Sequence, residues 1–127
     1  MSKRYKEIAE QYLIAIQKHV SEVVEGKTPE FMELNEIAFT LAISHKHLID
    51  VMQKTNGHHP CYFYDAEIIF HAKHLLLSTD KSIAEIARSL TYDPSNFSKF
   101  FKSKTSETPG SFRKKHKSEK FTTFRSR

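Results

Sequence analysis

The second half of this 127-residue chain repeats the first half at a fixed spacing of 49 positions. Apolar residues of one copy match apolar residues of the other, and they recur at the three- and four-residue steps typical of amphipathic helices. The chain must therefore fold into two like units, each a pair of short helices around a tight turn. The matched pairs are Leu34 and Ile83, Ile37 and Ile86, Ala38 and Ala87, Leu41 and Leu90, Ile43 and Tyr92, Leu48 and Phe97, and Met52 and Phe101.

Capping residues indicate where the helices of both units begin. In the second unit, Ser82 and Glu85 form a capping box, and Asp93 stands before a proline at the first helical position. Ser44 occupies the position equivalent to Asp93 in the first unit and is suited to the same role. We therefore predict first-unit helices over about 34–41 and 45–55, with matching helices in the second unit.

Helices are also predicted outside the two units. An amphipathic pattern covers 5–24 and is expected to pack on the first unit or to make a dimer contact, and 65–77 is typical of a linking helix. A last short helix begins at Thr108-Pro109. The prediction is an all-α fold of about seven helices, in which two helix-turn-helix subdomains are joined by the linking helix. The expected segments are 1–27 for the N-terminal helix, 28–63 for the first helix-turn-helix, 64–78 for the linking helix, 79–115 for the second helix-turn-helix and the final helix, and 116–127 for a basic, disordered tail.

The positive charge of the chain is concentrated at its C-terminal end. The formal net charge is +5 at pH 7, yet residues 113–127 hold seven Lys or Arg and one Glu, a net charge of +6. The preceding 112 residues then carry 13 basic and 14 acidic residues, a net charge of −1. Overall charge is therefore a weak argument for a polyanionic partner, and individual positions must supply the evidence.

The second helix of each unit has an inner face and an outer face. By helical spacing, Leu48, Val51 and Met52 point inward, and so do Phe97, Phe100 and Phe101. The outer faces are equivalent position by position, as expected of two helices that read DNA. They hold Lys46, Ile49, Asp50 and Gln53 in the first unit and Ser95, Ser98, Lys99 and Lys102 in the second.

Several side chains on these faces suit contacts with double-stranded DNA. Lys46 and Lys99 can donate to guanine or to phosphate, Asn96 can pair with adenine, and Ile49 can meet a thymine methyl group. Asp50 would repel phosphate unless it accepts from a cytosine amino group. Ser44, Ser95 and Lys102 suit phosphate. The predicted DNA-binding residues are Ser44, His45, Lys46, His47, Ile49, Asp50, Gln53, Ser95, Asn96, Ser98, Lys99 and Lys102.

The stretch from about Glu33 to Lys115 resembles the DNA-binding domain of the AraC/XylS family of bacterial transcription regulators. The matching segments are SIAEIA at 82–87, DPSNFSKFFK at 93–102, Thr108-Pro109, Phe112-Arg113 and parts of 67–76. The resemblance implies two recognition helices in successive major-groove segments of an asymmetric site. It also implies transcription activation through contact with RNA polymerase. Most members carry a separate sensor domain, so this chain is expected to be a stand-alone member or an excised domain.

Three positions depart from the family pattern. Ala42 and Thr91 stand where the family usually has a glycine that opens the turn, so a positive φ there would be strained. The second turn is one residue shorter than expected for the family. In the second unit, Ser106 occupies the position equivalent to Gly57, the glycine that ends the first recognition helix.

Other functions have less support in the sequence than DNA binding. His58, His59, Cys61, His71 and His74 match no zinc spacing, so neither a metal nor a cofactor is expected. Three scattered glycines form no phosphate loop, and Cys61 has no cysteine-rich module around it, so no enzyme is expected. The main alternative is a protein-interaction module with degenerate helix-turn-helix units, which binds polymerase or another regulator without reading DNA.

The remaining expectations concern location and partners. No run of about 18 apolar residues is present, so no membrane contact is expected. With its charged start and single cysteine, the chain is expected to be cytoplasmic and associated with the nucleoid. It is expected to be a monomer or weak dimer without a small-molecule site.

Overall fold

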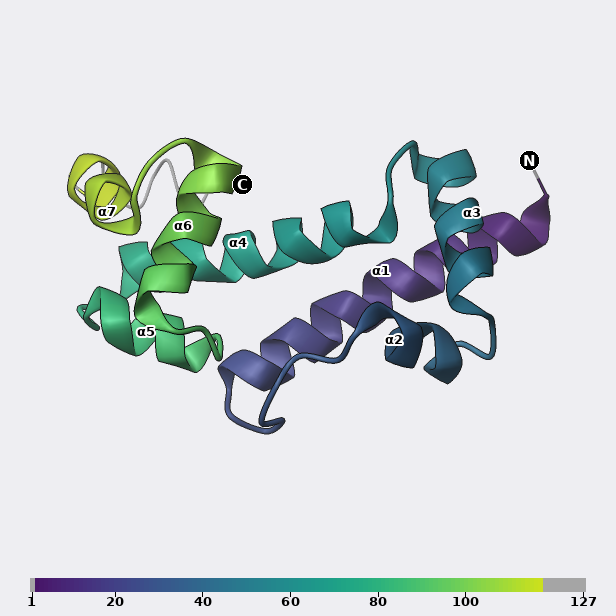
Figure 1. Cartoon of the computed structure of the whole chain (residues 1–127), viewed down its shortest axis with the longest axis horizontal. Coiled ribbons are helices and arrows are strands. Elements are labelled where there is room, and N and C mark those ends of the chain that lie inside the picture. Colours follow the sequence, from purple (N-terminus) through teal and green to yellow (C-terminus); the bar gives the residue numbers. More distant parts are fainter. Residues whose placement is uncertain (1, 118–127) are drawn as a thin grey trace.

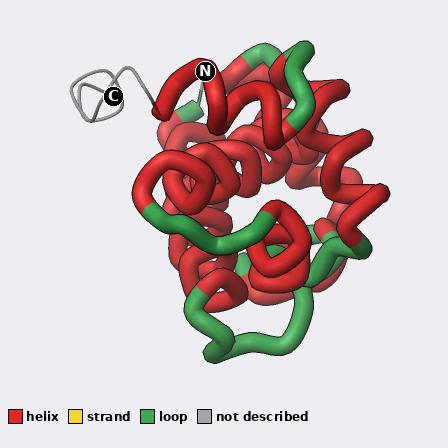
Figure 2. The backbone as a smooth tube through the Cα atoms, turned by 90° about the vertical axis from the view of Figure 1, so that its left-hand side faces the viewer, coloured by secondary structure: helices red, strands yellow, loops and turns green. Residues whose placement is uncertain are grey.

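The computed structural model describes residues 2–117, which form seven α-helices and no strand (Figures 1 and 2). This arrangement confirms the predicted all-α fold class. Most of the tail predicted over 116–127 lies outside the described residues. The helices are α1 (Lys3–Val24), α2 (Leu34–Thr40), α3 (His45–Asn56), α4 (Pro60–Ser78), α5 (Ile83–Ser89), α6 (Pro94–Thr105) and α7 (Pro109–Lys117).

Helix α1 packs along α3 and α4. Its buried stripe includes Ile8, Tyr12, Ile16 and Val20, which recur at four-residue steps and therefore share one face. The Tyr12 hydroxyl donates a hydrogen bond of 2.8 Å to the carbonyl oxygen of Pro60. This contact fastens the middle of α1 to the first turn of α4.

Helix α4 connects the two ends of the molecule (Figure 1). It packs on α1 and on α3 of the first unit, and on α7 and on α5 of the second unit. It begins at Pro60, earlier than the predicted start at 64, because His59 Nδ1 accepts from the Cys61 backbone N–H at 3.1 Å and proline suits the first helical position. With 19 residues, α4 is about 28 Å long.

Helix α7 secures the C-terminal end of α4. The last carbonyl groups of a helix lack partners within the helix. Arg113 donates to the carbonyl oxygens of Leu76 at 2.9 Å and Thr79 at 3.2 Å, and Lys117 donates to that of Thr79 at 3.0 Å. Helix α7 continues to Lys117, two residues beyond the predicted end of the final helix at 115. Part of the C-terminal basic charge serves the fold itself.

His19 is a buried polar residue of α1, with 8% of its surface exposed. Its Nε2 accepts a 2.9 Å hydrogen bond from the Met32 backbone N–H, so the ring is neutral at that nitrogen. Burial lowers the pKa of His19, although Glu22 and Glu36 act in the opposite direction. Protonation would break the bond to Met32.

We expect the protein to lose stability as the pH falls below the ordinary histidine pKa of about 6.5. Because the native pKa of His19 is lowered, the unfolded state binds the proton more readily than the native state. The contribution of neutral His19 to stability is therefore complete above a pH of about 6.5, and it is lost as the pH falls through the lower native pKa. The free energy of unfolding is measured by urea denaturation at pH 7.5 and at pH 5.0. Between these two values the wild type should lose on the order of 1 kcal/mol more of this free energy than His19→Gln does. Equal losses in the two proteins would contradict this role of His19.

Candidate nucleic-acid interface

The turns of the two units have the same backbone conformation. Ala42 and Thr91 open them with φ angles of 63° and 60°. Each turn closes with a hydrogen bond, from the Ile43 N–H to the Ala38 carbonyl at 3.1 Å and from the Tyr92 N–H to the Ala87 carbonyl at 2.9 Å. The second turn thus has the same length and bonding as the first, and its shortness relative to the family stays a prediction.

Both recognition helices have matching caps at each end. Ser44 Oγ accepts from the His47 N–H at 3.0 Å, and Asp93 Oδ2 accepts from the Ser95 N–H at 3.1 Å. Each helix ends on a residue with positive φ, 79° at Gly57 and 70° at Ser106. Equivalent turns and caps therefore fix where α3 and α6 begin and end.

The Ser95 side chain belongs to the cap of α6. Its hydroxyl donates a 2.8 Å hydrogen bond to Asp93 Oδ2, and this bond is the largest cause of the lowered pKa of Asp93. The hydroxyl proton that was predicted to reach phosphate is engaged in this bond. Ser95 therefore helps to order the first turn of the helix.

The inner faces of α3 and α6 largely match the sequence prediction. Leu48, Val51, Met52, Phe97 and Phe101 are fully buried. Phe100 differs, because its side chain is only partly buried and its ring stacks on Tyr92 at a centroid distance of 5.2 Å. The inner face of α6 is accordingly narrower than predicted.

The outer faces present most of the predicted DNA-binding residues to solvent. Lys46, Lys99 and Lys102 form no ion pair with any carboxylate of residues 2–117, so their charges are available. Ser44, His45, Lys46, Gln53, Ser95, Asn96, Lys99 and Lys102 are exposed, whereas His47, Ile49, Asp50 and Ser98 are partly buried.

Asp50 is bonded to helix α1, a contact that sequence reasoning missed. The Tyr5 hydroxyl donates to Asp50 Oδ2 at 2.5 Å, and Lys54 Nζ lies 3.2 Å from Oδ1. The Tyr5 bond lowers the pKa of Asp50, which stays ionised. An acidic residue on this face thus anchors α1, and its contact with a base stays a prediction. The start of the apolar stripe at Tyr5 was visible in the sequence, but its partner 45 residues away was not.

The histidines and Cys61 have separate positions within the fold. The His58 ring stacks on the Tyr62 ring at a centroid distance of 3.9 Å, and His59 caps α4. His71 Nε2 lies 3.4 Å from Glu67 Oε2. Burial raises the pKa of the Cys61 thiol. Among residues 2–117, no three His, Cys, Asp or Glu side chains are grouped so that they could hold a metal ion. None of the described helices is long and apolar enough to cross a membrane.

Comparison with known proteins matches residues 37–115 to the helix-turn-helix domain family. HTH-type transcriptional regulator YfiF of Bacillus subtilis (strain 168), itself uncharacterized, is 33% identical over 93 residues. That match covers 73% of this chain but only 30% of the relative's length.

Solved structures have the same fold. The C-terminal domain of AraT, a response regulator from Geobacillus stearothermophilus, superposes with a TM-score of 0.73 at 28% identity, over 85% of this chain and 84% of that one. The DNA-binding domain of the global transcriptional factor AdpA, solved in complex with a target DNA, superposes with a TM-score of 0.68 at 16% identity. This match covers 95% of this chain and 99% of that one. At 16% identity the second likeness supports the fold alone.

Thr91→Gly should stabilise the protein by about 1 kcal/mol. Glycine removes the steric cost of a β-branched residue at φ 60°, and this gain exceeds the added entropy of the unfolded chain. Thermal unfolding should show a rise of a few degrees in Tm. The control is Gln17→Gly within α1, which should lower stability by about 0.5–1 kcal/mol. A similar loss for both variants would rule out strain at Thr91.

Proposed function

The chain belongs to the AraC/XylS family of DNA-binding transcription regulators, which are not enzymes. On that basis we propose that helices α3 and α6 lie in successive major-groove segments of one double-stranded site. Each recognition helix places its N-terminal residues along base edges. The chain acts as a sequence-specific regulator.

The observation that carries this proposal is that a single helix, α4, joins two units whose turns and helix caps have the same backbone conformation. One turn of B-DNA separates successive major-groove segments on one face by about 34 Å. Helix α4, about 28 Å long, holds α3 and α6 at opposite ends of the molecule (Figure 1). The two helices thus have a spacing of the right order for adjacent major-groove segments.

The two outer faces differ in chemistry, which favours an asymmetric site. On α6, Asn96 suits adenine, Lys99 suits guanine and Lys102 suits phosphate. On α3, Lys46 suits guanine or phosphate and Ile49 suits a thymine methyl group. A monomer that uses both units would read two unlike blocks of sequence.

Activation of transcription through contact with RNA polymerase rests on the family resemblance alone. The proposed DNA partner rests on the family of DNA-binding regulators to which the chain belongs. The alternative of a protein-interaction module drew on the acidic charge of residues 1–112, on Asp50 and on the altered turns. Asp50 instead bonds to Tyr5, and the turns share one conformation. DNA binding is therefore the better supported function.

Selection of bound duplexes from a random pool tests the proposal directly. We expect an asymmetric motif of two blocks about one helical turn apart, and binding that weakens steeply from about 50 to 200 mM salt. A palindromic motif would indicate that a dimer reads the DNA. Absence of any enriched motif, together with weak salt dependence, would contradict the proposed function and favour the protein-interaction module.

Substitution of two lysines on α6 should separate base contacts from phosphate contacts. Lys99→Ala should cost about 1–3 kcal/mol on the selected duplex and relax specificity in one block. Lys102→Ala should weaken binding to all sequences alike and reduce the slope of log K against log salt by about one. Lys18→Ala, on the exposed side of α1, is the control and should change neither quantity. Equal losses for Lys99→Ala on selected and random duplexes would contradict its role in base recognition.

A further inference from the structure

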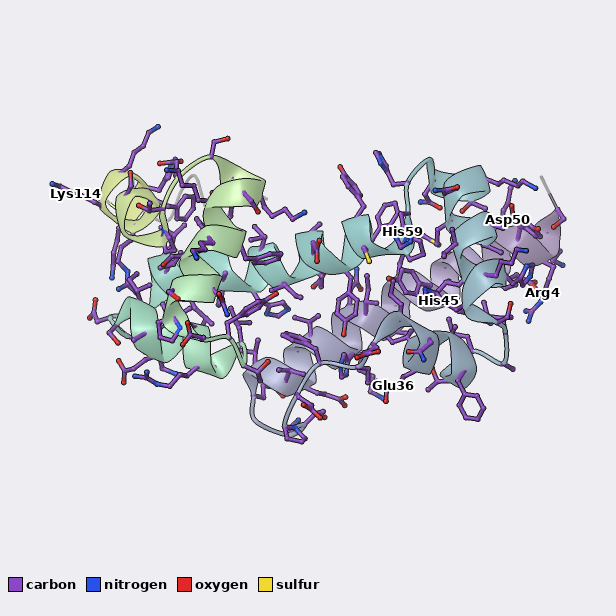
Figure 3. All side chains as sticks on the ribbon, in the orientation of Figure 1. Arg4, Glu36, His45, Asp50, His59 and Lys114 are labelled. Carbon is purple, nitrogen blue, oxygen red and sulfur yellow. The ribbon has the colours of Figure 1, made fainter. Side chains whose placement is uncertain are left out.

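The first turn of α1 lies against the first recognition helix. The Tyr5 hydroxyl bonds to Asp50 Oδ2, and the Tyr5 ring meets the His47 ring edge-on at a centroid distance of 5.4 Å. Ser2 Oγ accepts from the Tyr5 N–H at 3.1 Å and so caps the helix at this point. In Figure 3, Arg4 and Asp50 lie at the same end of the molecule. The start of α1 is therefore held beside the outer face of α3.

This first turn carries positive charge that α3 lacks. On α3, Lys46 is available, but Lys54 is paired with Asp50 at 3.2 Å. Helix α6 has two available lysines, Lys99 and Lys102, because Lys104 is paired with Asp65 at 3.3 Å, and it contains no acidic residue. The first recognition helix thus has one available lysine where the second has two.

Arg4 and Lys6 are exposed and flank Tyr5 along the chain. Successive residues of a helix are about 100° apart around its axis, so these two side chains leave α1 on either side of the stripe that contacts α3. Arg4 lies 3.8 Å from Glu7, in an ion pair whose side chains are both about half exposed. Pairs of that kind contribute little stability, so phosphate can compete for the guanidinium group.

We propose that the first turn of α1 is a third DNA-contacting element, in which Arg4 and Lys6 bind backbone phosphates next to the segment read by α3. The inference rests on the proposed DNA-binding function and extends it beyond the two helix-turn-helix units. Tyr5 is a positioning residue, because its bond to Asp50 sets where Arg4 and Lys6 lie relative to α3. The element lies outside residues 37–115, which match the helix-turn-helix family.

The test compares two double variants that remove the same charge. Arg4→Gln/Lys6→Gln changes the proposed element, and Lys18→Gln/Lys27→Gln changes exposed lysines at the other end of α1 and just beyond it. Binding to the selected duplex and to a random duplex is measured across a salt series. Each lost phosphate contact should reduce the slope of log K against log salt by about 0.9 and weaken binding roughly tenfold at 0.1 M salt. The control variant should match the wild type.

A double-mutant cycle tests the role of Tyr5. Tyr5→Phe keeps the ring and removes the bond to Asp50, so it should weaken DNA binding in the wild type. It should have little further effect in the Arg4→Gln/Lys6→Gln background, because the cations that it positions are already gone. Equal effects in both backgrounds would show that Tyr5 acts through the fold alone.

The outcomes separate this inference from the proposed function. If the wild type binds DNA with a steep salt dependence and Arg4→Gln/Lys6→Gln equals the control variant, the third element is wrong while the regulator function stands. If the wild type shows neither an enriched motif nor salt dependence, the proposed function itself fails. Both altered side chains are exposed, and circular dichroism and Tm confirm that each variant is folded.

Discussion

Burial of α4 on several sides is the constraint on which the rest of the structure depends. Each unit pairs a helix of 7 residues with one of 12, too little to bury a stable core alone. Helix α4 supplies Ile68, Ala72 and Leu76 to one continuous core. Because α4 serves both units, it also fixes their separation. Stability and the proposed spacing on DNA thus depend on the same helix.

The sequence was sufficient to predict the two units, because local rules decide them. Ser82, Glu85 and Asp93 cap their helices as their types require, and the fixed offset transfers the assignment to the other unit. The early start of α4 was missed because histidine is not among the favoured capping residues. The Tyr5–Asp50 bond was missed because it joins positions far apart in the chain. Such contacts follow from packing and leave no local pattern.

The turns show how tertiary contacts override local preference. Alanine and threonine disfavour a positive φ, yet both hold it at equivalent positions. Two constraints act together there: the turn hydrogen bonds to Ala38 and Ala87, and burial of those two alanines in the core. The surrounding contacts offset a cost of about 1–2 kcal/mol at each turn.

The two units meet mainly through α4, while their recognition helices, α3 and α6, lie toward opposite ends of the molecule. A substitution on the outer face of α6 is therefore expected to leave the backbone of α3 unchanged. If the two units read separate blocks of DNA as proposed, one half of the target sequence can be exchanged during evolution while the other is kept. A duplicated domain of this design can acquire new targets in two smaller steps, each of which retains part of the original affinity.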